Sequence, residues 1–301
     1  MIFPDEKRLR VACAKCMAEP SNIRAYDTLI TGCRSIGRNL LRFYHIIPPT
    51  SERMIYKTYD GTGIISYHKT IAEFCNKGKS LDGMLTYRRI RDVKKVRLAL
   101  LYDDSNSMTS WWRKQALQQN LEEGDAPQTY AKLACLSLME GLGRDMEINF
   151  WKFGSEARGP FNLSSNMYKE IIGSNGSGGT RLDLALQSMI DNGWHRRPGV
   201  KVAIVLTDGI PEVGRSVYAE DVIVNVRSLD LIKKLLQNKV HVLYLQLLTD
   251  ESRKYKKSGG YTLLEFGNDV QRMGCEYMTI NNKESLMESL FKGLNMVSRK
   301  I

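Results

Sequence analysis

The sequence predicts an α/β protein built on a doubly wound, mostly parallel sheet with helices on both faces. This prediction rests on residues 96–301, where short apolar segments alternate with longer amphipathic segments. Such an alternation is typical of parallel sheets, whose strands are buried on both sides. A helical extension comes first, because apolar residues recur at steps of three and four through residues 5–47.

The expected elements follow in order. Ser21 is a candidate cap for the N-terminal helix, which Pro48 and Pro49 would end. Two short strands are expected at 54–59 and 63–68, and a short helix at 70–76. Six further strands are expected at 96–103, 146–153, 160–163, 201–207, 240–247 and 275–280. Helices are expected at 127–142, 181–192, 226–238, 263–273 and 283–297. We therefore expect an extension over residues 1–79 and an α/β domain over residues 80–301.

Composition narrows the possible classes of protein. Hydrophobic residues make up 43% of the 301 residues, enough for a sizeable core. No apolar run approaches the roughly 20 residues of a membrane helix, and the charged N-terminus does not resemble a signal peptide. We therefore expect a soluble, cytoplasmic protein. The formal net charge of +11 is compatible with nucleic acid, an acidic protein or anionic lipid as partner, but no nucleic-acid motif accompanies it.

Oxygen-bearing side chains follow the predicted ends of two buried strands. Asp103, Ser105 and Ser107 follow the first strand of the α/β region, and Asp208 follows a later one, while Thr180 comes after a glycine-rich loop. Ligands of open parallel sheets bind beyond the carboxyl ends of the strands. Alternate residues of an extended segment also point the same way. Because Mg²⁺ prefers oxygen ligands, these five side chains predict a site for Mg²⁺, or for Mn²⁺ or Ca²⁺.

Simpler roles exist for each of these residues. Asp103 and Thr180 could be helix caps, and Ser105 and Ser107 could be ordinary loop hydroxyls. A residue can also cap a helix and bind a cation at once. The neighbouring Asp104 is expected to face solvent.

The combination resembles the metal-ion-dependent adhesion site of a von Willebrand factor A (vWA) domain, which has a Rossmann-like, six-stranded fold. The residues that carry the resemblance are the Asp-x-Ser-x-Ser run at 103–107, Gly-Gly-Thr at 178–180 and Thr-Asp-Gly at 207–209. Asn106 stands where the family usually has glycine, and asparagine tolerates a left-handed backbone better than most residues. The resemblance implies that a partner's Asp or Glu completes the coordination of the cation.

Within that family, the chain is similar to the intracellular CoxE-like branch. The similarity rests on the arginine-rich residues 80–97, the strand ending in Phe-Gly at 149–154, and residues 178–186. Proteins of this branch commonly work with MoxR-type AAA+ ATPases in remodelling or maturing client enzymes. The resemblance therefore implies a metal-dependent protein-binding adaptor with a AAA+ partner.

Four residues near the expected cation are candidates for the rim that contacts a partner. Gly179 and Glu212 belong to the second and third loops, and Trp111 and Trp112 follow the first loop. The two tryptophans could instead pack over the helix that follows the site. Exposed tryptophan is favoured in protein interfaces.

We do not expect an enzyme. The chain lacks the Gly-x-x-x-x-Gly-Lys-Ser/Thr motif of a P-loop, and none of the three loops contains a cysteine or histidine. Two alternatives remain open: an RNA- or nucleic-acid-binding vWA protein, favoured by the net charge, and a metal-dependent phosphohydrolase.

Overall fold

The structure is a computed structural model, and it divides the chain into two compact units. One unit contains Met1–Pro48 and Lys95–Ile301, and the other contains Pro49–Lys94. The N-terminal helices thus belong with the α/β region, whereas the expected boundary lay between residues 79 and 80. The structure describes residues 6–44, 50–58, 64–65, 85–93, 96–108, 127–142, 146–162, 165–174, 176, 178–214, 218–248 and 257–299, with the backbone alone for 50–58, 64–65, 85–93, Ser165 and Lys257.

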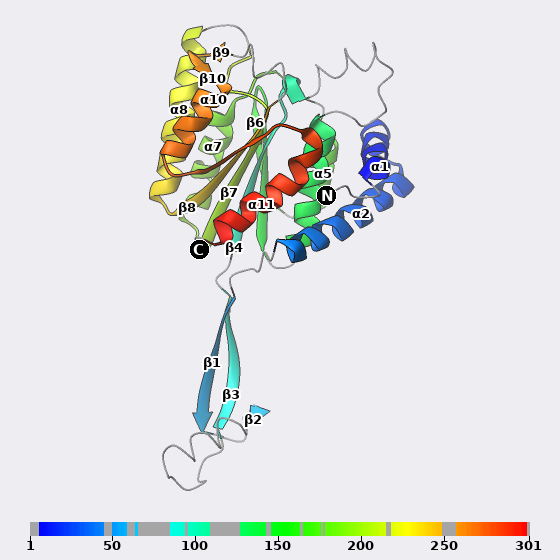
Figure 1. Cartoon of the computed structure of the whole chain (residues 1–301), viewed down its shortest axis with the longest axis vertical. Helices are drawn as coiled ribbons and strands as arrows, with labels where there is room; N and C mark the ends of the chain where they lie inside the picture. The colour runs from blue at the N-terminus through cyan, green and yellow to red at the C-terminus, as the bar shows by residue number, and fades with distance from the viewer. Residues whose placement is uncertain are drawn as a thin grey trace. The chain divides into compact units, whose positions relative to one another are not determined.

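A six-stranded sheet forms the centre of the first unit (Figure 1). Its strand order is β11-β8-β7-β4-β5-β6, and every neighbouring pair is parallel except β5 and β6. This confirms the prediction of a doubly wound, mostly parallel α/β fold with six strands. The strands are β4 (Val96–Asp103), β5 (Glu147–Phe153), β6 (Ala157–Asn162), β7 (Val200–Thr207), β8 (Val240–Leu247) and β11 (Glu276–Ile280).

Helices cover both faces of the sheet (Figure 1). On one face lie α5 (Pro127–Leu142), α6 (Ser165–Ile172) and α11 (Leu286–Ser298), and α1 (Glu6–Ala18) and α2 (Ile23–Phe43) pack outside them, mainly on α5. The other face packs against α7 (Leu182–Asp191), α8 (Tyr218–Gln237) and α10 (Leu263–Arg272). Shorter elements are η1 (Asn106–Met108), η2 (Trp194–Arg196), η3 (Lys283–Ser285), β9 (Lys257–Ser258) and β10 (Tyr261–Thr262).

The central strand β4 contributes to both cores. Its residues Leu98, Leu100 and Tyr102 lie in the core beneath α5, and Ala99 and Leu101 lie in the core on the opposite face. This alternation follows from the two-residue period of a strand. Every residue of β4 is buried, so the strand is fixed from both sides and places its last residue, Asp103, at the carboxyl edge of the sheet.

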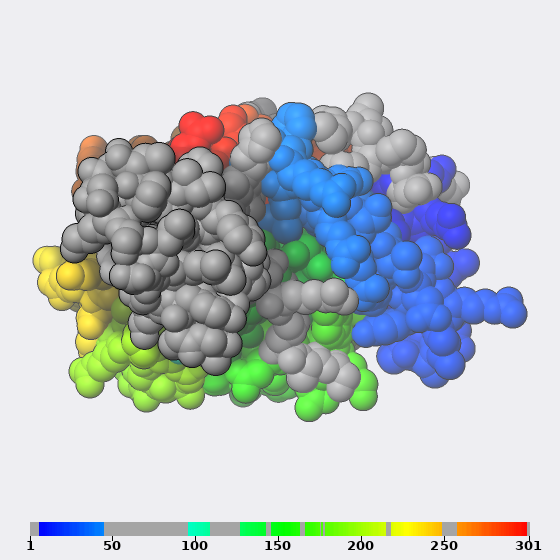
Figure 2. Space-filling view, turned by 90° about the horizontal axis from the view of Figure 1, so that it is seen from below, coloured from blue at the N-terminus to red at the C-terminus, as the bar shows by residue number. Residues whose placement is uncertain are grey.

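Helix α2 packs closely against α5. A side chain at Gly37 would meet the backbone of Ser137, and one at Gly141 would approach the backbone of Gly37. At the edge of the contact, Arg34 Nε donates to Glu140 Oε2 at 2.6 Å. In the space-filling view, the blue surface of α1 and α2 lies beside green segments from the middle of the chain (Figure 2). The helical extension is therefore part of the α/β core.

The second unit is a three-stranded antiparallel sheet in the order β1-β3-β2. Its strands are β1 (Thr50–Thr58), β2 (Ile64–Ile65) and β3 (Leu85–Val93). Strand β3 contains Arg88, Arg89 and Arg91 of the arginine-rich residues 80–97, and it pairs with β1 along its full length.

Most expected elements agree with the structure to within a few residues, and α5 and β4 agree at both ends. The N-cap of α2 is Asn22, whose side chain accepts from Ala25 N at 3.1 Å, in place of the expected Ser21. The short helix expected at 70–76 lies outside the described residues. Among the helices that are described, none is long and apolar enough to cross a membrane.

Candidate metal centre

Asp103 is the last residue of β4, and its side chain is fully buried. Its Oδ1 accepts a hydrogen bond from Ser105 N at 2.8 Å, and its Oδ2 accepts one from Thr207 Oγ1 at 2.5 Å. Thr207 ends the neighbouring strand β7. The carboxylate is therefore held from two strands at once, in a fixed orientation.

Hydroxyl groups connect the first loop to Asp208. Ser107 Oγ donates to Asp208 Oδ1 at 2.7 Å, and Ser105 Oγ lies 2.9 Å from Ser107 Oγ. Because Ser107 gives its proton to the carboxylate, Ser105 is the donor in the second bond. Four of the five predicted ligands thus meet in one hydrogen-bonded cluster at the carboxyl edge of the sheet.

The glycine-rich second loop is attached to both other loops. Thr180 and Glu212 form a two-way backbone bridge, with both N to O distances at 3.0 Å. Asn106 N donates to Gly178 O at 3.2 Å. These backbone contacts bring Thr180 to the same edge as the other four residues.

The two glycines before Thr180 are required by geometry. Gly178 has a left-handed φ of +66°, and a side chain there would overlap Ser155. A β-carbon at Gly179 would lie 2.5 Å from the carbonyl carbon of Val213. Asn106 begins η1, and among the described non-glycine residues only Lys239 has a positive φ. The first loop therefore forms without a left-handed backbone conformation at Asn106.

The hydroxyl of Thr180 is the clearest sign that a ligand belongs at this edge. Thr180 is 1% exposed, and its Oγ1 has no hydrogen-bond partner among the described residues. The N-cap of α7 is Arg181, so Thr180 does not cap that helix, which was the simpler role open to it. A buried hydroxyl without a partner is unfavourable, and a cation would use its lone pair.

The electrostatics of the cluster also favour a cation. Burial, followed by the negative charge of Asp208, raises the pKa of Asp103 to about 7. In the described part of the chain, no group of three or more His, Cys, Asp or Glu side chains is placed to hold a metal. The donor set is instead two carboxylates and three hydroxyls. This all-oxygen set fits Mg²⁺, and it lacks the nitrogen or sulfur ligands typical of zinc.

The predicted rim is described only in part. Gly179 is buried against the third loop, and Glu212 is half-buried at the bridge to Thr180. Trp111 and Trp112 lie outside the described residues, so their role stays a prediction.

The expectation for Asp104 was wrong. Asp104 is 8% exposed, and its Oδ1 accepts from Gly176 N at 2.8 Å and from Gln128 Nε2 at 3.4 Å. Asp104 points away from the cluster because neighbouring residues of an extended chain face opposite sides. Sequence reasoning named Thr207 only as part of the Thr-Asp-Gly motif and did not predict its hydrogen bond to Asp103.

No model of a known protein family matches the chain, and no curated protein matches it. Solved structures with a similar fold include the PilB minor pilin from Streptococcus sanguinis, with a TM-score of 0.51 and 15% identity over 74% of this chain. A mutant of that pilin matches with a TM-score of 0.50 and 14% identity over 72% of this chain. The alignments span 66% and 65% of the pilin chains, which is under two thirds. The pilus adhesin SpaC from Lactobacillus rhamnosus GG matches with a TM-score of 0.45 and 15% identity, over 72% of this chain and 32% of the adhesin. Together with the strand order of the sheet, the likeness to the two pilin structures shows a vWA-like fold.

Proposed function

We propose that this protein is a metal-dependent protein-binding module. It would hold a divalent cation, Mg²⁺ by ligand chemistry, through Asp103, Ser105, Ser107, Thr180 and Asp208. The observation that carries the proposal is the hydrogen bond between Ser107 Oγ and Asp208 Oδ1, because it joins the Asp-x-Ser-x-Ser loop to the Thr-Asp-Gly loop.

The donor set explains why the cation would bind a partner. Three of the five proposed ligands are neutral hydroxyls, which add no negative charge to that of the two carboxylates, and five ligands leave one position of an octahedral ion open. When bound, the ion would supply an electrophilic position for one more anionic oxygen, such as the carboxylate of a partner's Asp or Glu. Charge-assisted contacts of this kind are strong and directional, so the loss of the acidic group should greatly weaken the complex.

The first test is metal binding by variants that keep the shape of the site. Asp208→Asn removes one negative charge from the proposed ligand set, and we expect calorimetric Mg²⁺ or Mn²⁺ uptake to fall below detection. Asp230→Asn is the matched control, because Asp230 is an exposed aspartate on α8. Metal uptake by Asp208→Asn equal to that of the control would refute the proposal.

The second test concerns the partner. Proteins retained by the wild type and the Asp230→Asn control in Mg²⁺ should be lost in chelator and with Asp208→Asn. If the same proteins are retained in chelator and by Asp208→Asn, binding does not use the cation. A MoxR-type AAA+ partner and the alternative of RNA binding remain predictions from the sequence.

A further inference from the structure

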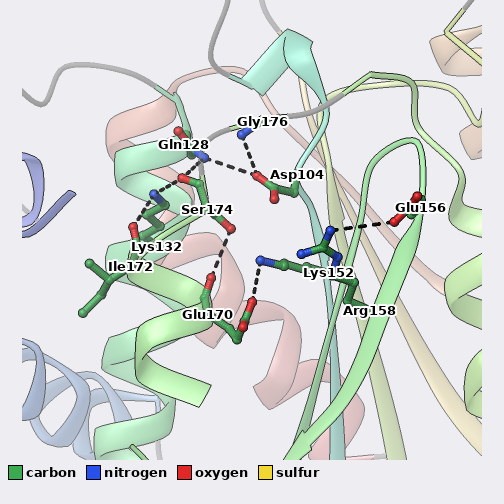
Figure 3. Close-up of polar contacts among 10 residues, drawn as sticks. All are labelled: Asp104, Gln128, Lys132, Lys152, Glu156, Arg158, Glu170, Ile172, Ser174 and Gly176. Atoms are coloured by element: carbon green, nitrogen blue, oxygen red, sulfur yellow. Dashed lines mark hydrogen bonds and ion pairs between the residues drawn. The ribbon is translucent and has the colours of Figure 1, made fainter. Parts of the chain in front are cut away.

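A buried lysine lies behind the first loop, on the side away from the proposed ligands. Lys132 belongs to α5 and is fully buried. Its Nζ donates to Ile172 O at 2.8 Å and to Ser174 O at 2.5 Å (Figure 3). These carbonyls belong to the end of α6 and the turn after it, so Lys132 satisfies acceptors that a helix leaves unpaired at its C-terminus.

Gln128, one turn earlier on α5, extends this network to the first loop. Its Nε2 donates to Ser174 O at 2.6 Å and to Asp104 Oδ1 at 3.4 Å. Asp104 in turn accepts from Gly176 N at 2.8 Å. Figure 3 shows these groups pointing toward one another from α5, the end of α6 and the residue after Asp103. The network thus joins α5 to the segment 173–176 and to the end of β4.

The segment 173–176 leads directly into the glycine-rich loop that contains Thr180. A pocket of about 400 Å³ borders the segment, with Gly173 and Gly176 in its wall opposite Lys152 and Gly154. Lys132 Nζ and Gln128 Nε2 donate to Ser174 O, and Gly176 N donates to Asp104 Oδ1, so side chains from outside the segment hold Ser174 and Gly176.

Burying the ammonium group of Lys132 carries a desolvation cost. Burial lowers its pKa to about 8, an effect that Cys13 and Asp104 oppose. The other lysine of this region, Lys152, instead pairs with Glu170 at 2.5 Å. An apolar side chain could fill the volume of Lys132 without the cost of desolvating an ammonium group. What an apolar side chain could not supply is the pair of donors that holds the two carbonyls.

We propose that Lys132 and Gln128 are positioning residues for the metal centre, and that they set its cation affinity by holding the segment that leads to Thr180. This inference rests on the proposed metal site. Neither side chain belongs to the proposed ligand set. They act through Ser174, and Gln128 also acts through Asp104, which accepts from Gly176 N and adjoins Asp103 in the chain. Outer-shell groups of metal sites commonly change affinity by about 10- to 100-fold.

The test uses the full chain and two variants of similar size, Lys132→Met and Gln128→Met. The control is Ser137→Ala, which removes a buried polar group from the same helix without touching the segment 173–176. We expect each of the two variants to bind Mg²⁺ or Mn²⁺ at least about tenfold more weakly, and the control to bind as the wild type does. In chelator, amide hydrogen exchange of peptides covering 173–182 should be faster in both variants and unchanged in the control.

The outcomes separate this inference from the proposed function. Wild-type affinity and unchanged exchange in Lys132→Met and Gln128→Met would overturn the positioning role and leave the metal site standing. A wild type that takes up no cation would overturn the proposed function and this inference with it. If Lys132→Met fails to fold, Gln128→Met decides, because it removes the bonds to Ser174 and Asp104 while the lysine stays.

Discussion

The buried pair Asp103 and Asp208 should make the cation-free protein less stable as pH rises. The ordinary pKa of an aspartate side chain is 3.8, and burial together with the charge of Asp208 raises the pKa of Asp103 to about 7 in the folded protein. A carboxyl whose pKa is raised by folding favours the folded state fully below its ordinary pKa. That contribution is lost as pH rises toward the folded pKa, and it stays lost above it.

The size of the effect follows from the two pKa values. One pH unit corresponds to about 1.4 kcal/mol, so the change in pKa amounts to roughly 4 kcal/mol in all. Between about pH 5 and pH 8 the loss attributable to Asp103 should be about 3 kcal/mol. Mg²⁺ at the higher pH should restore much of it, because a cation compensates both carboxylates.

The assay is urea unfolding in chelator at about pH 5 and about pH 8, for the wild type and for Asp103→Asn. The asparagine side chain has nearly the same shape as aspartate and stays neutral. The free energy of unfolding of the variant should therefore fall by about 3 kcal/mol less than that of the wild type between the two pH values. Burial lowers the pKa of His195, which stabilises the folded state as pH rises, but this contribution is common to both proteins and cancels in the comparison. Equal pH dependence of the two proteins would refute the reasoning.

Two smaller predictions concern the framework of the site. Gly179→Ala should destabilise the protein by roughly 1–3 kcal/mol and weaken cation binding, because the new β-carbon would lie 2.5 Å from the carbonyl carbon of Val213. Thermal unfolding with and without Mg²⁺ measures both effects. An unfolding temperature and a Mg²⁺ response equal to those of the wild type would contradict the prediction. Thr262→Ala removes the capping box that Thr262 and Glu265 form at the start of α10 and should cost about 1 kcal/mol with no change in cation affinity. A calorimetric titration that does show a weaker cation affinity would mean that α10 contributes to the site.

The sequence predicted the elements with uninterrupted apolar patterns best. Strand β4 is buried along its whole length, and α5 is buried on nearly every side, so both ends of each were predictable. Helix α8 was expected to start at Val226 but starts at Tyr218. Its first turns carry exposed Ile223 and Val226, which disturb the amphipathic pattern that sequence reasoning relies on.

The candidate site was predictable where its residues obey local spacing rules. Sequence reasoning grouped Asp103, Ser105 and Ser107 by the alternation of an extended segment. Hydrogen bonds do join the three residues, although Ser107 lies in η1 and not in an extended segment. Asp104 could not be placed, because its burial depends on Gly176 and Gln128, which are far away in the sequence. Lys132 was missed for the same reason, since nothing in an apolar helix pattern reveals the carbonyls that its ammonium group meets.

The insertion of the second unit after α2 bears on biosynthesis. Helix α2 is made before residues 49–94, yet its apolar residues Leu29, Ile36 and Leu40 are covered by α5, which emerges after them. The inserted strands β1, β2 and β3 are close together in the sequence, so they can pair before the rest of the first unit has been synthesised. During synthesis, the apolar face of α2 therefore stays exposed until α5 has been made. In that interval the nascent chain is most open to chaperone binding and to aggregation.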